Sequence, residues 1–592
     1  MESLASGSLP IASPQDRRSP VDCILFAIAI APAIYLAWLI SQTAVNILLL
    51  DEWDYIFLFR HLTSHSLTLH DLLQQHNESR TTLPNLIVLG LGSLTHWDVR
   101  WDMWVMFFFA CVISINIYFL SRRTFTRRQS LCLWVIANVL IFSTEQNQNW
   151  LWGIQMIVFM PILFITTGMV IAYSRISTAW KFIACMTLAT ASTFSYANGQ
   201  LAWVVLLGAL IFGSAKKSAR IVWLILLYLA GFAANLLLYY HDYHPPGNSP
   251  SMSIALKKPI AAMEYFAGFL GASLGEGMHQ FWISVGFGLV LIAWTIITCA
   301  IVWRERARTE WLQSASIWLL IAAYTLASGA ITTAGRLGFG LKQSQDSRYT
   351  TFSLYLVVAL LYLGAMIVRD VYHRRGLLSA SICASLGLAL ILIPQFWTQT
   401  DGNRQMWAAR RANLTGKAVA ELNRIDIVPG WLYPVPSKIT NEVGFLDQMG
   451  YLSPGLVKDR DLSRIEDDNA GKFAGYLDSI VPQPYGTWLA RGWAINALYH
   501  EPAVVVVLAG DDLLGHSRGF AIAGVGGMRL DVAAIEKDRR YKLCGWGVFF
   551  SLAKVPPGTV AISAWAFNPL TGLAYRLAGS APWNNAKTHA AG

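Results

Sequence analysis

The chain has 592 residues, of which 55% are hydrophobic and only 14% are charged, and its formal net charge is +10. A soluble globular protein carries roughly 25% charged residues, so this composition excludes an ordinary soluble enzyme and favours lipid as the solvent of the chain. The basic residues fall in short clusters between apolar runs. That distribution argues against a nucleic-acid-binding protein and carries information about membrane topology instead.

Eleven apolar runs, each near the ~20 residues that cross a bilayer, predict an all-α polytopic membrane bundle. They lie near residues 21–50, 101–121, 130–144, 154–173, 181–196, 200–214, 221–240, 281–303, 311–333, 350–369 and 377–397. The first run is too long for a signal peptide and lacks a cleavage site, so we expect it to be retained. The shorter, glycine-bearing run 83–97 predicts a helix in the membrane interface.

This choice of spans puts the basic clusters, from Arg17–Arg18 to Arg374–Arg375, on one side of the membrane. By the positive-inside rule that side is the cytoplasm, so the N-terminus is expected inside and the C-terminus outside. The polar stretches of interest then share the outer side, and the helix interiors are almost free of ionisable residues. A transporter usually keeps charged groups near the midplane, so the pattern favours an enzyme at the membrane surface.

The stretch DEWDY places Asp51, Glu52 and Asp54 directly after the first predicted span. Partial loss of water at the interface would raise the pKa of Asp51 and make it a better base. An acidic cap that merely ends the span is the alternative. If the chain binds a divalent cation (Mg²⁺, Mn²⁺ or Ca²⁺), these three carboxylates are the candidate ligands, because hard cations prefer clustered carboxylate oxygens. No cofactor is otherwise indicated.

The following stretch, SHSLTLHDLLQQHNESR, predicts an amphipathic helix lying on the membrane, with Ser66 or Thr68 as its N-cap. Its end combines several different hydrogen-bonding groups just before Pro84, which suits carbohydrate hydroxyls. These candidate substrate-binding residues are His76, Asn77, Glu78 and Arg80. A solvated helix face is the alternative interpretation.

Three further outer stretches supply candidate binding residues. EQNQNWLWG combines amides, among them Gln146 and Asn149, with the indoles of Trp150 and Trp152. Amides can bind sugar hydroxyls and an indole can cover a ring face; an interfacial aromatic belt would explain the tryptophans but not four amides in a row. The other candidates are Tyr196 and Asn198 in SYANG, where a plain helix cap is the alternative, and Arg348 and Tyr349 in SRYTTF.

A guanidinium at the outer start of a span, as at Arg348, can hold a phosphate through two parallel hydrogen bonds. The alternative is a flanking charge whose side chain reaches out of the membrane.

An Asp-Glu pair after the first span, a surface helix in the first outer loop and a many-span body resemble the GT-C superfamily of membrane glycosyltransferases, which use polyprenyl-phosphate-linked sugars. The order DEWDY, QQHNESR, NWLWGIQ, FSYANG and SRYTTF also resembles a bacterial group with this layout, over roughly residues 20 to 400. The resemblance implies Asp51 as general base, Glu52 as a second acid and Arg348 as a ligand of the donor phosphate. The HNES segment departs from the basic residue that the group has near that position.

The C-terminal region, residues 398–592, differs in composition from the apolar runs before it. Residues 398–475 are mixed, and from about 476 short β-type runs alternate with glycine and proline turns, which predicts an antiparallel, sandwich-like domain. Its tryptophans are interpreted as core residues rather than a binding surface: Trp488, Trp493, Trp546 and Trp565. A calcium site at Asp511–Asp512 is a weaker interpretation of one loop.

The expected domains are a cytoplasmic tail (1–20), a GT-C-like transmembrane domain (21–397) with an outer loop and surface helix (51–100), a mixed linker (398–475) and an extracytoplasmic sandwich-like domain (476–592). The expected function is transfer of a sugar, with inversion, from a polyprenyl-phosphate donor to a glycan, lipid or protein acceptor at the bacterial inner (plasma) membrane. The partners are thus the bilayer, the donor and the acceptor, and no nucleic acid. Two alternatives stay open: a flippase or exporter of lipid-linked saccharides, and a membrane-anchored glycan-binding protein.

Overall fold

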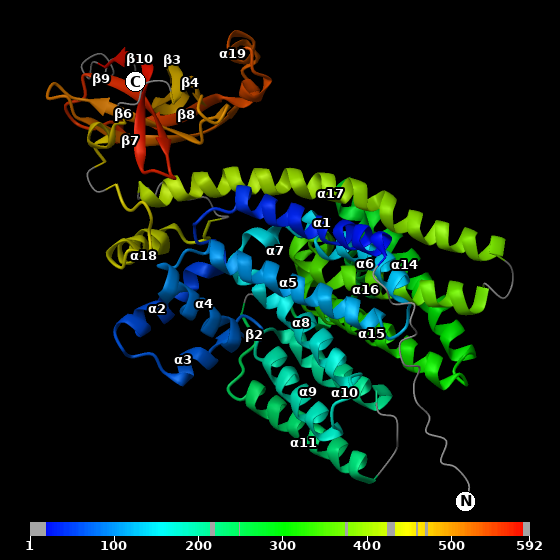
Figure 1. Ribbon diagram of the computed structural model, residues 1–592. Coiled ribbons are helices and arrows are strands. Elements are labelled where there is room, and N and C mark those ends of the chain that lie inside the picture. Colours follow the sequence, from blue (N-terminus) through cyan, green and yellow to red (C-terminus); the bar gives the residue numbers. More distant parts are fainter. Residues whose placement is uncertain are drawn as a thin grey trace, which may run out of the picture. The chain divides into compact units, whose positions relative to one another are not determined.

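The computed structural model describes residues 19–213, 219–247, 249–372, 377–422, 432–457, 460–467 and 472–583. The basic residues Arg17–Arg18, Lys216–Lys217 and Arg374–Arg375 of the topology prediction, and the cytoplasmic tail up to residue 18, lie outside them. The chain divides into two compact units (Figure 1). The first comprises residues 1–44, 61–91 and 100–407, and the second comprises 45–60, 92–99 and 408–592.

Helices make up the first unit and continue into parts of the second. Their bounds are α1 (Pro20–Thr43), α2 (Ile56–Thr63), α3 (Leu69–Leu73), α4 (Thr82–Thr95), α5 (Arg100–Ser121), α6 (Arg127–Ile141), α7 (Asn147–Leu151), α8 (Met156–Ala172), α9 (Thr178–Thr193), α10 (Leu201–Gly213), α11 (Ala219–Tyr240), α12 (Ser253–Lys257), α13 (Pro259–Gly275), α14 (Phe281–Arg304), α15 (Thr309–Arg336), α16 (Ser347–Ile367), α17 (Leu377–Glu421) and α18 (Pro436–Gln448).

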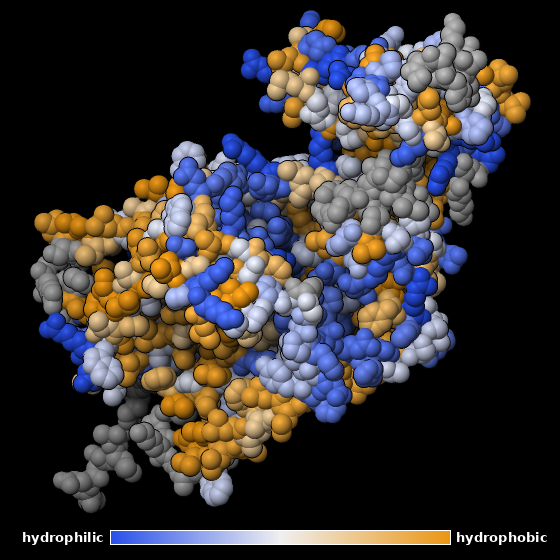
Figure 2. Space-filling model, turned by 180° about the vertical axis from the view of Figure 1, so that it is seen from behind, coloured by the Kyte–Doolittle hydropathy of each residue, from blue (hydrophilic) through white to orange (hydrophobic). Residues whose placement is uncertain are grey.

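Among the described residues, eight helices are long and apolar enough to cross a membrane. Each of the eleven predicted spans contains a helix, but α6, α9 and α10 are shorter than this length. Figure 2 shows that much of the surface over the helices is hydrophobic. Large apolar side chains are exposed there, such as Trp223, Leu237 and Ile260. Side chains of this kind facing outward are compatible with a lipid-exposed surface.

The first helix is shorter than the sequence suggested. α1 ends at Thr43, Ala44 is extended, and Asp51 lies in a separate 3₁₀ helix, η1 (Leu50–Tyr55). The expectation that Asp51 directly follows a rigid span is therefore wrong. Apolar composition continues to Leu50, but the helix does not, so hydropathy alone overestimated the length of the span.

The predicted surface helix over SHSLTLHDLLQQHNESR is also wrong beyond its first turn. α3 covers only Leu69–Leu73, and its N-cap is Thr68, whose hydroxyl accepts a hydrogen bond from the Asp71 N–H, as predicted. The following residues form a small hairpin of β1 (Gln75–His76) and β2 (Ser79–Arg80). Asn77 has a φ of +50° in its turn, a left-handed conformation that Asn tolerates better than most residues and that stops a helix. The run 83–97, in contrast, forms the expected helix as α4.

The long outer loop predicted before residue 281 contains α13, which packs against α14. The two helices approach to backbone contact: a Cβ on Gly271 would lie 1.9 Å from the Ser284 carbonyl oxygen, and one on Gly288 would lie 1.8 Å from that of Ala267. Glycine is thus required at both positions by space, not by backbone dihedral angles. The short connection between these helices presents Glu276 and His279.

The C-terminal part of the second unit is a β-barrel, not a sandwich. Its strands are β3 (Phe473–Gln483), β4 (Thr487–Asn496), β5 (Glu501–Pro502), β6 (Val505–Asp511), β7 (Ser517–Gly527), β8 (Gly545–Ser551), β9 (Ala561–Asn568) and β10 (Leu573–Pro582). They follow the order β3-β10-β9-β6-β7-β8-β4-β5. β3 pairs with β10 in parallel and with β4 antiparallel, which closes the sheet. A single strand can be predicted from neighbouring residues. The pairing of β3 with β10, which closes the barrel, joins the first and last strands of the domain and cannot be predicted in this way.

Apolar side chains such as Val506, Leu508 and Trp546 form one core of the barrel, and Trp565 belongs to a second cluster with the end of α17. Trp546 and Trp565 are buried, which confirms the interpretation of these two as core residues. α17 runs past residue 397 to Glu421, so a helix occupies the start of the predicted linker.

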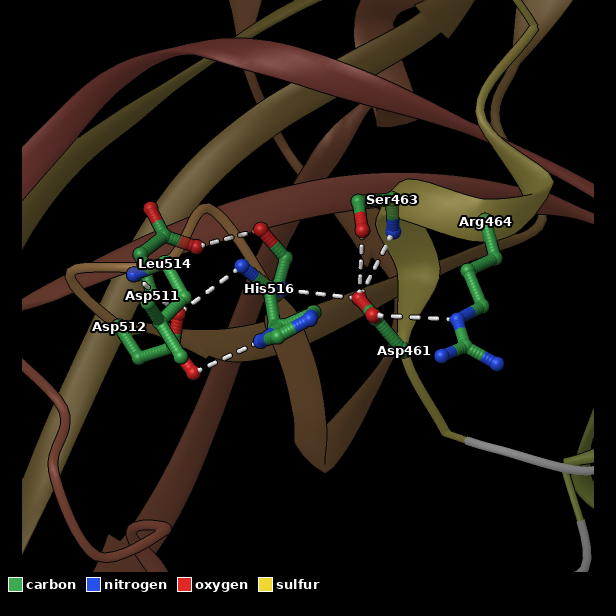
Figure 3. A network of polar contacts seen from close by, with 8 residues as sticks. Asp461, Ser463, Arg464, Asp511, Asp512, Leu514 and His516 are labelled. Carbon is green, nitrogen blue, oxygen red and sulfur yellow. Dashed lines mark hydrogen bonds and ion pairs between the residues drawn. The ribbon is translucent and has the colours of Figure 1, made fainter.

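The loop between β6 and β7 is closed by its own polar groups (Figure 3). Asp512 accepts hydrogen bonds from the backbone N–H groups of Leu514 and His516 and pairs with the His516 ring at 3.0 Å. Asp511 accepts from Ser517 and Ser563 and pairs with Arg576. These carboxylates therefore have local structural partners, and the calcium interpretation gains no support from the structure.

Replacing Gly288 by valine tests the contact between α13 and α14. We expect a loss of about 1–3 kcal/mol in the free energy of unfolding, because the new side chain must displace the backbone at Ala267. Gly286 of the same helix is the matched control: among the described residues nothing lies within 4 Å of a Cβ built there. The measurement is thermal unfolding of the detergent-solubilised chain; equal melting temperatures for Gly288→Val and Gly286→Val would contradict the close contact.

Candidate functional site

Polar segments that are far apart in the sequence meet in the first unit, around the start of α16. The Ser347 hydroxyl donates to the Glu145 carbonyl at 2.6 Å, and the Asn149 amide donates to the Thr351 hydroxyl at 2.7 Å. The Ala197 N–H donates to the Ser79 hydroxyl at 3.1 Å. Hydrogen bonds thus join the stretch after residue 145 to the one after residue 343, and the stretch after residue 74 to the one after residue 195.

A cavity of about 340 Å³ lies beside these contacts. Carboxylates, amides and two basic side chains line most of it: Glu145, Asn147, Gln148, Glu276, His279, Phe281, Lys342, Gln345, Asp346, Ser347, Asp401 and Gln405. Close packing of α17 brings Asp401 to the wall. The Thr144 hydroxyl donates to the Gln399 carbonyl at 2.8 Å, and a Cβ on Gly402 would lie 2.4 Å from the Thr144 carbonyl.

Glu145 is the most deeply buried acid of this cavity, with 2% of its surface exposed. Its Oε2 has no hydrogen-bond partner among the described residues. Burial, and then the nearby carboxylates of Glu276 and Asp401, raise the pKa of Glu145 well above its usual value. Burial therefore favours the protonated form of Glu145, and a protonated carboxyl group can donate a hydrogen bond to a ligand in the cavity.

Glu276 has a different environment and a different protonation behaviour. Burial raises its pKa to about 7; the neighbouring His279 opposes this, and the carboxylates of Asp401 and Asp346 add to it. Its Oε2 also lacks a hydrogen-bond partner among the described residues. His279 Nε2 lies 2.8 Å from Asp401 Oδ1 and is held by that pair. Glu276 can thus exchange a proton near neutral pH, whereas burial shifts Glu145 toward its protonated form.

The predicted phosphate ligand Arg348 lies next to this cavity. Its guanidinium pairs with Asp346 at 2.9 Å and lies over the Tyr349 ring at 5.2 Å, but its Nε has no hydrogen-bond partner within the described residues. Burial raises the pKa of Tyr196 to about 12, with smaller effects from Tyr349 and from two arginines, one of which is Arg348. Arg348 is thus joined to the cavity through Asp346, while the basic side chains of the lining itself are Lys342 and His279.

The second of those arginines, Arg336, pairs with Glu78 at 2.6 Å. Glu78 also accepts a hydrogen bond from the Ser249 hydroxyl at 2.5 Å. Glu78, Arg336 and Arg348 all act electrostatically on the pKa of Tyr196. The predicted binding residue Glu78 therefore lies in the same region as Arg348.

Other predicted binding residues have structural partners. The Arg80 guanidinium donates to the backbone carbonyls of Leu73, Tyr239 and His241, so it ties the hairpin to the end of α11. His76 and Asn77 belong to the hairpin, with their side chains 3.4 Å apart. These contacts assign Arg80 to the fold rather than to a ligand.

The amide and indole stretch is mostly internal as well. Gln146 is fully buried between the Ile141 carbonyl and the Thr351 hydroxyl, and Trp150 donates to the Ser143 carbonyl. Trp152 and Asn198 are buried too. Only Asn149 keeps an amide oxygen without a hydrogen-bond partner among the described residues.

The three carboxylates of DEWDY belong to the second unit. Glu52 is buried and its carboxylate accepts a hydrogen bond from the Leu49 N–H at 2.8 Å, whereas Asp54 pairs with Lys438 and accepts from the Tyr433 hydroxyl. Asp51 is partly buried in η1. In the described residues, no three His, Cys, Asp or Glu side chains form a group that could hold a metal ion.

Sequence reasoning missed Glu145, Glu276, His279 and Asp401 as site residues. Glu145, Glu276 and Asp401 each lie a few residues outside a predicted apolar run, as Asp51 does, so acidic residues next to such runs were a usable signal. That signal could name the residues but could not show that they share one cavity.

No protein-family model matches the chain, and no curated protein sequence matches it.

The pH dependence of stability tests the environment of Glu276. Its pKa rises from 4.5 to about 7 on folding, so the folded state holds an extra proton between these values, and stability falls as the pH rises through this range. We expect Glu276→Gln to remove on the order of 1–3 kcal/mol of the stability loss between about pH 5 and pH 8. Thermal unfolding at both pH values measures it. Glu310→Gln, at an exposed position, is the control, and an unchanged pH dependence in Glu276→Gln would refute the assignment.

Proposed function

We propose that the protein is an integral membrane glycosyltransferase that transfers a sugar from a polyprenyl-phosphate donor to a glycan, lipid or protein acceptor outside the cytoplasm. The observation that carries the proposal is the cavity at the start of α16. Glu145 and Glu276 line it, and each has a carboxyl oxygen without a hydrogen-bond partner among the described residues. The lining also includes Asp346 and Ser347, which directly precede Arg348 in the chain. Glycosyl transfer from a lipid phosphate needs these two kinds of group: a proton acceptor and a cation for the departing phosphate.

The cation in this proposal is Arg348. One of its nitrogens is held by Asp346, which orients the guanidinium, and its Nε is available within the described part of the chain. A planar guanidinium binds a phosphate in two-point geometry and stays charged at every relevant pH. Lys342, which lines the same cavity, adds positive charge on that side.

Two carboxylates are proposed for the role of base. The resemblance to GT-C enzymes implies Asp51, which lies in the second unit. Glu276 is favoured by the geometry of the first unit, because it lines the cavity and its pKa of about 7 suits proton exchange at neutral pH. Glu145, which lines the cavity together with Glu276, is proposed to form a hydrogen bond with a sugar hydroxyl.

The proposed reaction balances in one step. The acceptor hydroxyl gives its proton to the carboxylate, and its oxygen forms a bond to the anomeric carbon of the donor sugar. The bond from that carbon to the phosphate oxygen breaks, and its electron pair leaves with the phosphate, beside Arg348. Attack opposite the leaving group inverts the anomeric centre, so a product that retains the donor configuration would count against this mechanism.

The membrane arrangement is part of the proposal. The basic clusters between apolar helices favour a cytoplasmic N-terminus in the inner (plasma) membrane, with the polar cavity and the C-terminal barrel outside. The eight apolar helices in the described part of the chain support the membrane assignment.

Transfer assays with paired variants separate the two bases. Membranes containing the chain are incubated with radiolabelled polyprenyl-phosphate sugars, and we expect Glu276→Gln to lose about 10²- to 10⁴-fold in kcat. If Asp51→Asn loses transfer activity and Glu276→Gln does not, Asp51 is the base. Glu310→Gln serves as the control. If the purified wild type binds these donors but no product forms with any acceptor fraction, the flippase alternative replaces the enzyme.

Arg348 is tested through its charge. We expect Arg348→Gln to reduce kcat/KM by about 10²-fold, since a group that holds the developing phosphate charge contributes roughly 3 kcal/mol to the transition state. Arg348→Lys keeps the positive charge but lacks the planar guanidinium that forms two parallel hydrogen bonds, so it should retain only part of the wild-type activity. Equal activities of wild type and Arg348→Gln would remove Arg348 from the mechanism.

A further inference from the structure

The C-terminal barrel has an open hollow of about 660 Å³ on strands β4, β7 and β8. Half of the residues that line it are glycines: Asp478, Arg491, Gly492, Gly524, Val525, Gly526, Gly527, Met528, Arg529, Gly545, Trp546 and Gly547. Glycine in a strand is unfavourable, because it loses backbone entropy on folding and offers no side chain to pack. So many glycines in one place therefore require a reason.

Internal packing explains only some of them. A Cβ on Gly492 would lie 2.1 Å from the Tyr476 carbonyl oxygen, and one on Gly545 would lie 2.9 Å from that of Gly527. At Gly524 and Gly526, in contrast, a Cβ would meet nothing within 4 Å among the described residues, and neither position has a positive φ. Side chains would fit at these two positions, and because the residues are glycines the backbone of β7 is not covered by side chains there.

The bare strand faces solvent but has no free sheet edge. Gly524, Gly526 and Gly547 are exposed, yet β7 pairs with β6 on one side and β8 on the other, while β8 also pairs with β4. The backbone hydrogen bonds of these strands are therefore used within the barrel, and a peptide cannot add to them as another strand. The hollow offers instead a flat surface of peptide planes, which a flat ligand can cover.

The rim of the hollow is charged. Arg529 pairs with Asp478 at 2.6 Å and with Asp531 at 2.8 Å. Arg491 is exposed and has no ion-pair partner within the described ranges. Asp478 and Asp531 balance Arg529, so Arg491 is the charge of this lining that an anionic ligand would balance.

A buried donor lies at the same place. Trp546 is 4% exposed, and its indole N–H has no hydrogen-bond partner among the described residues. A buried N–H without a partner costs free energy, so such a group is usually satisfied, and Trp546 is one of the residues that line the hollow.

From these features we infer that the hollow on β4, β7 and β8 binds a saccharide chain that carries acidic groups. A sugar ring can lay its flat C–H face on the strip formed by Gly524, Gly526 and Gly547. Its hydroxyl and carboxylate groups then reach Arg491 and the Arg529–Asp478 pair. All of these residues belong to the second unit, so the inference does not depend on the proposed transfer reaction.

The test measures binding of glycans by the full chain in detergent. The chain is applied to an array of uronic-acid, sialylated, phosphorylated and neutral oligosaccharides, and the affinity for the bound glycans is then determined in solution. We expect acidic glycans to bind, and Gly526→Leu and Arg491→Ala to weaken the binding by about tenfold or more. Because a leucine at Gly526 has open space, it fills the hollow without disturbing the barrel.

Arg518→Ala, at an exposed arginine of β7 outside the hollow, is the matched control and should bind like the wild type. Melting temperatures confirm that each variant is folded. The inference fails if no acidic glycan on the array binds the wild type. It also fails if Gly526→Leu binds as tightly as the wild type, or if a polyglutamate peptide binds as tightly as the best glycan, since charge alone would then explain the binding.

Discussion

The candidate site depends on one close contact, between the start of η2 (Thr144–Gln146) and the middle of α17. The Thr144 N–H and hydroxyl both bond to Gln399, and Gly402 lets the backbone of α17 lie against Thr144. A side chain at Gly402 would separate the two segments. Their contact carries Glu145 and Asp401, from positions far apart in the sequence, to the wall of one cavity. Burial, and then the nearby carboxylates of Glu276 and Asp401, raise the pKa of Glu145 at this wall.

The chemistry of the cavity follows from unequal burial. Glu145 is nearly inaccessible, and burial raises its pKa well above the usual value, whereas Glu276 retains some exposure and has a pKa of about 7. Asp346, which lines the same cavity, pairs with Arg348. The different burial of the two glutamates is the physical basis of their different affinities for a proton.

In the barrel, the exposed glycines of β7 leave part of the strand surface without side chains. Most of its glycines have a steric reason, but Gly524 and Gly526 do not, and the difference becomes visible only when the space around each Cβ is examined. The tryptophans, in contrast, behave as ordinary core residues: Trp546 and Trp565 lie inside, where their size stabilises the barrel. The feature of the barrel that suggests a saccharide-binding surface is therefore the exposed backbone at Gly524 and Gly526, and not these buried tryptophans.

The sequence by itself determined the helical body and the strands of the tail. Long apolar runs must form helices in lipid, and alternating runs between turns form strands, because both patterns depend on near neighbours. Only the tertiary structure decided where α1 ends, that Asn77 turns a hairpin, and that β3 closes a barrel. It alone showed that Arg80 and Gln146 have internal hydrogen-bond partners while Glu276 and Asp401 share a cavity with Glu145. The barrel closure and the cavity depend on contacts between residues far apart in the chain, such as Tyr476 with Ala578 and Thr144 with Gln399, and no local pattern encodes such contacts.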